Sequence, residues 1–596
     1  MDQVYRALGW MGLYQMVQFM MLRITLVDNS LHALSFIFLG RVFDHKCSEI
    51  DIPNPSFGGG QSWMLNSSDD VNSSLIVTYG TCSVTVTNQS DKLFSSKCVN
   101  GYDYSEPRDR SFVSEWDLVC EKEALPEVSQ TFMSVGKMIG SSFMMTLADR
   151  YGRKPIFVLC HVMYFVTAFA TAFVPNFTTF VCFRFAHGIF HQGKGLTSAI
   201  MLVELLPMER RALPSQLSSL LWPCGLLFLN LICYLCQEMS WRSIELILAA
   251  FSCYSLIQWW MLEESLRWLD VQGKTQQVER LIKKAAKRNG VDPATALLVY
   301  KEESKKMLTS LPVSTKSFES RAENNLDIHQ AAPIEKTQDV EFNMKAPSTS
   351  GGPEAENRNK AKDLSCSTFL KNKLVLTRCA ISCFMWFTDS MVYYGLLIIS
   401  PSLTGGFYLG FALNVLVQFP AGAAFVFLIN RLGRRRSMIL SHLICGLSLA
   451  TAVLLSHLPG ATSTLGLKIT ILIVSLMGTF GITFGFSVLI LYTPELFPTT
   501  IRSTGFGMSS FAARMGGMIA PHSRTLRRHL PWLPGTIFAT LALVIPVLVR
   551  WLPETQDHEL PQTVSDIRVE TRPAPPQRTT IVTGRKQKTA VTETMR

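Results

Sequence analysis

The segment Asp149-Arg-Tyr-Gly-Arg-Lys154 decides the fold, because a second copy, Asn430-Arg-Leu-Gly-Arg-Arg435, follows 281 positions later (430−149). In both copies a glycine precedes basic residues at the point where one long apolar run gives way to the next. Glycine suits a tight turn between consecutive helices, since it adopts backbone angles that other residues avoid. The recurrence therefore predicts that the chain contains a duplicated unit.

Two further pairs of segments keep nearly the same spacing. Glu204-Leu-Leu-Pro207 returns 291 positions later (495−204) as Glu495-Leu-Phe-Pro498, and an arginine lies seven residues after each glutamate. Glu264 returns 290 positions later (554−264) as Glu554. Three pairs at nearly one offset predict two halves that have the same orientation.

Long apolar segments separate these motifs. Of the 596 residues, 48% are hydrophobic and 17% are charged, a composition typical of a membrane protein. Because a helix needs about 20 residues to cross the hydrocarbon core, we predict an all-α membrane protein with about twelve spans. They lie near residues 11–39, 128–147, 156–174, 179–203, 213–236, 244–262, 375–399, 407–429, 438–457, 468–491, 505–521 and 534–552. The first apolar run is too long for a cleaved leader, so it is expected to remain as a signal anchor.

Basic residues divide the connecting loops into two classes. Loops rich in Lys and Arg alternate with loops that have few, and cytoplasmic loops carry the excess of positive charge. The basic loops contain Arg150, Arg153, Lys154, Arg210, Arg211, Arg431, Arg434, Arg435, Arg436 and Arg502. We therefore place these loops and both termini in the cytoplasm. This topology explains the net charge of +11 without a nucleic-acid partner.

The long loop between the first two spans, residues 40–127, is then extracellular. It contains three glycosylation sequons, which begin at Asn66, Asn72 and Asn88. It also contains four cysteines, which can form two disulfides in an oxidising compartment, with three alternative pairings. These are Cys47, Cys82, Cys98 and Cys120. Since none of them forms a CxxC pair, a zinc site is not favoured and no metal is expected.

These features divide the chain into four parts. Residues 1–264 are predicted as an N-terminal six-helix half, and residues 371–552 as a C-terminal six-helix half. Between them, residues 265–370 are rich in Lys, Glu, Ser, Asn and Pro, and are predicted as a mostly disordered cytoplasmic linker that begins with a surface helix around Gln276 to Arg288. Residues 553–596 are predicted as a cytoplasmic tail.

Charged motifs at the cytoplasmic helix ends are predicted to act as a gate. A carboxylate such as Asp149 or Glu204 can cap a helix or pair with a neighbouring arginine, and such bonds would break when the halves separate. The predicted gating residues are Asp149, Arg150, Arg153, Glu204, Arg211, Glu264, Arg267, Arg434, Glu495, Arg502 and Glu554. Because Asn430 replaces an acid, the first-half loop and the two Glu-Leu-x-Pro segments are expected to carry most of this latch.

Several motifs together make the sequence recognisable. They are His45-Lys-Cys47, Ser114-Glu-Trp-Asp-Leu-Val-Cys120, Asp149-Arg-Tyr-Gly-Arg-Lys154, Glu264-Ser-Leu-Arg-Trp-Leu269, Trp386-Phe-Thr-Asp-Ser390, Tyr393-Tyr-Gly395 and Glu495-Leu-Phe-Pro-Thr-Thr-Ile-Arg502. With them the chain resembles the solute carrier 22 family of organic ion transporters, in the major facilitator superfamily, from Gly12 to Thr555. The resemblance implies transport of small organic ions across a plasma membrane by alternating access. No Gly-rich phosphate loop or hydrolytic triad is visible, so neither an enzyme nor a cofactor is expected.

Arg514, in the middle of the eleventh span, bears on the charge of the substrate, because ionisable residues inside a membrane mark functional sites. In the resembled family, cation carriers have Asp at this position, whereas anion and carnitine carriers have Arg. Ser487 likewise stands where cation carriers have a glutamate. Since arginine pairs with carboxylate or sulfate through two parallel hydrogen bonds, an organic anion or a carnitine-like zwitterion is the preferred substrate.

Other residues within the spans complete the predicted substrate site. Near the centre of the fourth span, Lys194 would reinforce an anion site and His191, beside Gln192, would titrate near neutral pH. Aromatic walls for an organic ion are expected from Trp386, Tyr393, Tyr394 and Phe484. The coupling ion, whether a proton, sodium or an exchanged anion, and the oligomeric state stay open.

Three alternatives compete with this interpretation. In the first, Arg514 is neutralised by an intramembrane acid, Asp28 or Asp389. In the second, the protein is a cation carrier that uses one of these acids. In the third, it is a receptor of the same fold that binds without transporting, as the departures Met145 and Asn430 suggest. The sequence assigns no function to the basic run from His522 to His529.

Overall fold

The computed structural model describes residues 1–9, 11–49, 75–88, 91–207, 212–309, 372–402, 406–459, 464–498 and 501–556. Some predicted features lie outside these ranges. They are Asn66, Asn72, Arg210, Arg211, residues 310–370 of the linker, residue 371 of the second half and residues 557–596 of the tail.

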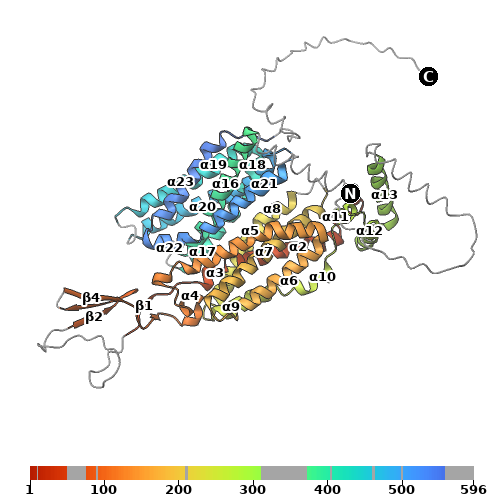
Figure 1. Ribbon diagram of the computed structural model, residues 1–596. Coiled ribbons are helices and arrows are strands. Elements are labelled where there is room, and N and C mark those ends of the chain that lie inside the picture. The colour runs from red at the N-terminus through yellow and green to blue at the C-terminus, as the bar shows by residue number, and fades with distance from the viewer. Residues whose placement is uncertain are drawn as a thin grey trace, which may run out of the picture.

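The helices of the first half form one bundle (Figure 1). They are α1 (Asp2–Ala7), α2 (Leu13–Ala33), α3 (Ser35–Leu39), α5 (Leu125–Tyr151), α6 (Arg153–Thr171), α7 (Phe177–Leu205), α8 (Ala212–Leu235), α9 (Trp241–Phe251) and α10 (Ser255–Met261). The helices of the second half form another bundle. They are α16 (Lys373–Ile399) with the 3-10 turn η5 (Ser400–Ser402), α17 (Phe407–Leu416), α18 (Gln418–Leu432), α19 (Arg434–Ser456), α20 (Leu465–Leu496), α21 (Arg502–Ile519), α22 (His522–His529) and α23 (Leu533–Val549).

Seven segments of the described chain are long and apolar enough to cross a membrane. These are α2 with α3, α6, α9 with α10, α16 with η5, α17 with α18, α19 and α20. The remaining long helices are α5, α7, α8, α21 and α23, of which α8 and α23 are apolar over a shorter length. The others are more polar because they carry residues such as Lys137, Lys194 and Arg514. Together these helices match the twelve predicted spans within five residues at every boundary.

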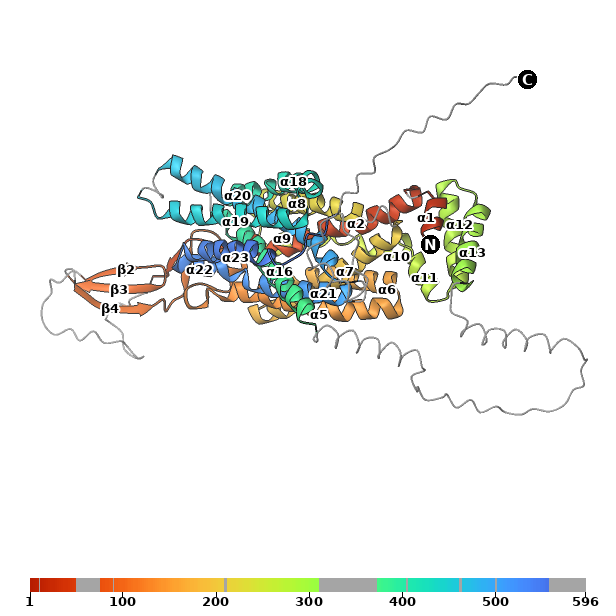
Figure 2. The same ribbon diagram turned by 90° about the horizontal axis from the view of Figure 1, so that it is seen from above.

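The two bundles lie side by side, with their helices roughly along one direction (Figures 1 and 2). One end of the molecule carries the strands of the long loop, and we call it the loop end. The opposite end carries α1, α11, α12 and α13, and we call it the motif end. Aromatic residues join the halves towards the loop end, where Phe38 of α3 lies 5.7 Å from Phe407 and 5.0 Å from Phe411 of α17, measured between ring centroids.

Glycines let the helices that position the site approach closely. A Cβ at Gly140 of α5 would lie 2.2 Å from the carbonyl oxygen of Ile189 in α7. In the second half, a Cβ at Gly516 of α21 would lie 2.2 Å from the carbonyl oxygen of Phe387 in α16. Small residues at helix interfaces permit such backbone contact inside a membrane. The pairs α5–α7 and α16–α21 therefore hold equivalent places in the two halves.

The long loop folds into two small antiparallel sheets that disulfides stabilise. In one, β1 (His45–Cys47) pairs with β5 (Tyr102–Tyr104), and in the other the strand order is β2 (Leu75–Tyr79), β3 (Ser83–Asn88), β4 (Asp91–Lys97). Of the three alternative pairings, the structure has Cys47–Cys98 and Cys82–Cys120. Asn88, the first residue of the third sequon, is the last residue of β3.

Short helices anchor this loop to the first half. Between the sheets and α5 lie η1 (Arg108–Arg110), α4 (Phe112–Glu115) and η2 (Cys120–Lys122). The carboxylate of Glu115 accepts hydrogen bonds from Trp241 Nε1 at 2.5 Å and from Arg242 at 2.6 Å, so the loop is bound to the start of α9.

The linker begins with more helix than the sequence predicts. After α11 (Leu266–Val271), the predicted surface helix is present as α12 (Thr275–Asn289), and α13 (Pro293–Thr309) follows it. The prediction that the linker is disordered after Arg288 is therefore wrong for the segment that ends at Thr309. The polar composition was misleading, because Val278, Ile282, Ala296 and Tyr300 form a small core with α1.

Candidate functional site

A pocket lies between the two halves, where α5 of the first half faces α16 and α21 of the second. It is lined by Ala33, Leu34, Gln130, Ser134, Lys137, Ser390, Tyr394, Ile398, Ala513, Arg514, Gly517 and Pro521. Because both halves contribute walls, a ligand bound here contacts both, as a rocking mechanism requires. We call it the central pocket.

Two positive side chains line the central pocket, Lys137 from α5 and Arg514 from α21. Lys137 is only 9% exposed, and neither side chain forms an ion pair with any acid in the part of the chain that the structure describes. The Nε of Arg514 is buried without a hydrogen-bond partner. Burial of an unpaired charge is costly, and an anionic ligand would compensate both cations.

Neutral polar groups share the central pocket with the cations. Gln130 donates from Nε2 to the carbonyl oxygen of Ala33 at 3.1 Å, while its Oε1 is buried without a partner. Ser134, Ser390 and Tyr394 also line the pocket. None of the described residues that line it is acidic. This arrangement suits a negatively charged organic ligand better than a cation.

Two of the predicted substrate-site residues, Arg514 and Tyr394, line the central pocket, and the structure places several others elsewhere. Trp386 donates from Nε1 to Thr493 Oγ1 at 2.8 Å, and with Phe484 it belongs to the buried core of the second half. Tyr393 accepts from Trp222 Nε1 at 2.8 Å across the halves and donates to Gln418 at 2.9 Å.

The last predicted residue of the second half, Ser487, forms only a local contact. Its hydroxyl donates to the carbonyl oxygen of Thr483, one turn earlier in the same helix, at 3.1 Å.

The predicted residues of the fourth span belong to a polar cluster inside the first half. Lys194 is fully buried and donates to Asp28 Oδ2 at 2.5 Å, and His161 lies 3.1 Å from the same oxygen. The positive charge of Lys194 is therefore matched by Asp28 and does not add to an anion site. His191 contacts the carbonyl oxygen of Asn29 at 3.2 Å, and Gln192 is buried beside it.

The two acids that the sequence offered as partners for Arg514 are engaged elsewhere. Asp28 has the partners just described, and Asp389 accepts from His442 Nε2 at 2.7 Å. Both acids are buried within their own halves. The alternative in which either of them neutralises Arg514 is therefore wrong for this structure.

The halves are joined at the loop end by residues of α22, the basic run without a predicted function. Arg524 donates to Glu127 Oε1 at 2.7 Å and to the carbonyl oxygen of Gly40 at 3.1 Å. Glu123 binds both Arg528, at 3.6 Å, and His529. One turn after Glu127, Thr131 donates to the carbonyl oxygen of Met518 at 3.1 Å. These contacts join the two halves at the loop end.

At the motif end, the first charged motif forms a cap within the first half. The carboxylate of Glu264 accepts from the backbone N–H groups of Arg153 and Lys154 at 3.1 Å, at the start of α6. Burial raises the pKa of Glu264, although these N–H groups oppose the shift. Arg153 in turn lies 2.5 Å from Asp149 and 3.6 Å from Glu204.

Glycine at the turn makes room for this cap. Gly152 has a φ of 116°, and a Cβ there would lie 2.5 Å from Glu264 Oε2. Nearby, Arg267 donates to the carbonyl oxygen of Glu204 at 3.1 Å and pairs with Asp2 of α1 at 2.6 Å.

The second charged motif repeats this geometry. Glu554 accepts from the backbone N–H groups of Arg434 at 2.9 Å and Arg435 at 3.2 Å, at the start of α19. Arg434 lies 3.3 Å from Glu495. Arg502 donates to the carbonyl oxygen of Phe497 at 3.3 Å, and Arg150 lies over the Tyr151 ring. All these contacts join helices of one half, so the expectation that they break when the halves separate is not supported.

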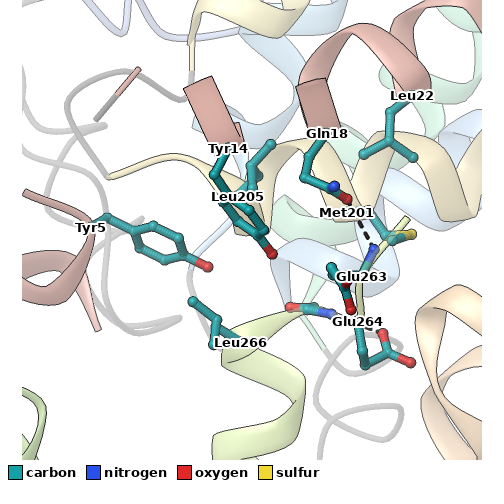
Figure 3. A pocket seen from close by; sticks show the side chains of 10 residues that line it. Tyr5, Tyr14, Gln18, Leu22, Met201, Leu205, Glu263, Glu264 and Leu266 are labelled. Carbon is teal, nitrogen blue, oxygen red and sulfur yellow. Dashed lines mark hydrogen bonds between the residues drawn. The ribbon is translucent and has the colours of Figure 1, made fainter. Parts of the chain in front are cut away.

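A smaller pocket at the motif end lies within the first half (Figure 3). It is lined by Tyr5, Tyr14, Gln18, Leu22, Met201, Leu205, Glu263, Glu264, Ser265 and Leu266. There the backbone N–H of Glu263 donates to Gln18 Oε1 at 3.0 Å. The pocket marks the junction where α1 and α11 pack against α2 and α7.

Four residues that line the central pocket were not predicted from the sequence, namely Lys137, Gln130, Ser134 and Ser390. The signal for Lys137 was available, because it is a lysine in the middle of the second predicted span, where a charge is costly. Gln130, Ser134 and Lys137 also fall at intervals of four and three residues, which places them on one face of a helix.

Comparisons with known proteins agree with the fold of this chain. The profile of the Major Facilitator Superfamily matches residues 128–521. Among solved structures, the proton:xylose symporter XylE bound to 6-bromo-6-deoxy-D-glucose is 16% identical, with a TM-score of 0.50 over 74% of this chain and 89% of that one. This structural likeness supports the fold alone.

Curated relatives of similar length belong to the family that the motifs resemble. Organic anion transporter 3 of Oryctolagus cuniculus is 26% identical over 95% of this chain and 93% of its own. Solute carrier family 22 member 6-A of Xenopus laevis is 25% identical over 94% and 92%. Solute carrier family 22 member 3 of Mus musculus is 27% identical over 95% of each. They confirm the resemblance to solute carrier 22, and the profile match over most of the chain shows that this multi-pass membrane protein belongs to the major facilitator superfamily.

Proposed function

We propose that this protein transports small organic anions across the plasma membrane by alternating access. The observation that carries the proposal is the central pocket, where Lys137 and Arg514 lack acidic partners and no acid is found among the described lining residues. A zwitterion such as carnitine would also need an acidic side chain in the pocket to bind its positive group. Of the two predicted substrate classes, organic anions and zwitterions, anions are therefore preferred.

The contacts between the halves support a conformation in which the central pocket is closed at the loop end. The pair Arg524–Glu127 and the contacts of Glu123 and Thr131 must separate before a ligand can enter from that side. At the motif end, each half retains its own cap. Movement of one half against the other would then open the pocket to the two sides in turn.

The orientation follows from the same ends of the molecule. The two disulfides suit an oxidising compartment, so the loop end faces the exterior, and the motif end with the N-terminal helix α1 faces the cytoplasm. On this proposal the six-helix halves are residues 1–264 and 371–552, with residues 265–370 as linker and residues 553–596 as cytoplasmic tail.

Uptake into oocytes tests the proposal with labelled anionic, zwitterionic and cationic probes. The wild-type protein is expected to accumulate anions, and Arg514→Gln is expected to reduce that uptake at least about tenfold, because a charge-assisted hydrogen bond is lost. Arg550→Gln, an exposed substitution at the end of α23, serves as the control and is expected to retain uptake. Surface labelling checks that all variants reach the membrane.

Other outcomes would replace the proposal. Accumulation of cations alone, with no effect of Arg514→Asp, would establish a cation carrier. Saturable binding of anions without flux in either direction would establish the receptor.

A further inference from the structure

The central pocket contains a second positive charge that the proposed function does not require. One arginine is enough to bind a carboxylate or a sulfate through two parallel hydrogen bonds. Lys137 faces the same pocket from the opposite half, on α5. The side chain of Lys137 is only 9% exposed, so water compensates little of its charge.

Two paired cations elsewhere in the molecule, the buried Lys194 and the partly buried Arg524, show what Lys137 lacks. Lys194 has Asp28 at 2.5 Å, and Arg524 has Glu127 at 2.7 Å. No acid of the described chain forms an ion pair with Lys137, and no acid lines its pocket. Two like charges in one pocket repel each other where water is scarce. A ligand that supplies only one negative charge would leave one of them uncompensated.

We propose that Lys137 is a second substrate-binding cation, which makes the central pocket selective for organic ions that carry two negative charges. The inference rests on the proposed function and narrows it to dianions, such as phosphate monoesters or dicarboxylates. Arg514 offers a planar fork, whereas the ammonium of Lys137 offers a compact charge with three rotatable donors. Ser134 and Ser390 add neutral donors and acceptors to the lining of the same pocket.

The placement of the two cations has a mechanical consequence. Lys137 moves with the first half and Arg514 with the second. A dianion that contacts both removes the repulsion across the interface between the halves, and so stabilises the conformations in which they approach. Binding then favours closure by its differential interaction with the two states. A monoanion held by Arg514 alone does this less well.

Phenyl phosphate and phenyl sulfate test this inference, because they have nearly the same shape and carry about two and one negative charges at pH 8. Uptake of each is measured with the full-length protein and with Lys137→Met and Lys137→Arg. We expect Lys137→Met to reduce phenyl phosphate uptake at least about tenfold and to change phenyl sulfate uptake less than about twofold. Lys137→Arg is expected to restore the preference, which a merely structural role would not predict.

A second pair of probes shows whether the two negative charges bind as one group or as two separate groups. Glutarate and its monomethyl ester differ in the number of carboxylates on one chain. If Lys137→Met lowers glutarate uptake and spares the ester, the two cations bind separate groups. If only phenyl phosphate responds, they converge on one group. Both results support the inference.

The outcomes that contradict the inference differ from those that contradict the proposed function. If the wild-type protein takes up monoanions but Lys137→Met lowers both members of each pair equally, or neither, Lys137 does not select charge. If no anion enters at all, the proposed function itself fails.

Discussion

The first charged motif, Asp149–Lys154, and the second, Asn430–Arg435, form the same cap with different side chains around it. In both, a glutamate from the end of the half binds two backbone N–H groups at the start of a helix, Glu264 at α6 and Glu554 at α19. Only the first motif adds an acid in the same segment, Asp149, whose side chain is 66% exposed. The comparison teaches that the partly buried cap, present in both halves, is the stabilising element and that the exposed ion pair is an addition.

Among substitutions in the two motifs, removal of a cap should lower the stability most. Glu264→Ala leaves the N–H groups of Arg153 and Lys154 unpaired, and Glu554→Ala does the same for Arg434 and Arg435. We expect each to destabilise its half by about 2 kcal/mol. Thermal denaturation of detergent-purified protein measures the loss, and Glu→Gln at each site, which keeps an acceptor, should cost less. Unchanged stability in one variant would show that the two caps are not equivalent.

Substitution of the turn glycines should have an intermediate effect. Gly152 and Gly433 have φ values of 116° and 84°, and in each a Cβ would lie 2.5 Å from an oxygen of the capping glutamate. We expect Gly152→Ala and Gly433→Ala to cost about 1–2 kcal/mol in the same assay. Gly466→Ala, where a Cβ meets nothing within 4 Å, is the matched control. An effect as small as that of the control would mean that the turn relaxes around the new Cβ.

Exchange of the acid between the motifs should have the smallest effect. Asp149→Asn removes an exposed pair with Arg153, and Asn430→Asp creates the equivalent spacing to Arg434, four residues later. Exposed pairs of this kind contribute about 0.3–0.5 kcal/mol. We therefore expect small shifts of opposite sign in the denaturation midpoint, which high salt should reduce. A loss of transport in Asp149→Asn without loss of stability would restore the latch interpretation.

The spans and the repeat were predictable from the sequence because each depends on local patterns. Long apolar runs and the Gly-Arg turns at 152–153 and 433–434 are visible without knowledge of distant contacts. The disulfide pairing was not predictable, since four cysteines permit three connectivities. The helix α13 was missed because its apolar face is completed by α1, which lies far away in the sequence.

Residues of the candidate site were harder to predict, since their roles depend on which charges meet in space. Arg514 and Lys194 look alike in sequence, as cations near the middle of predicted spans. Asp28, 166 positions before Lys194, neutralises one of them, while the other faces the central pocket. Trp386 and Phe484 were expected as pocket walls, but the packing of α16 against α20 and α21 turns them into the core.

The caps also restrict where the energy difference between transport states can arise. If the halves move as rigid bodies, as the proposed mechanism requires, the bonds of each cap are equally present before and after a switch and cancel from the energy difference. The bias towards one state must then come from contacts that form in only one of them. At the loop end, such contacts include Glu123, Glu127 and Thr131 against α22 and the end of α21, and Phe38 against α17. The eight residues of the basic helix α22 would thus help to set how often the transporter faces outwards.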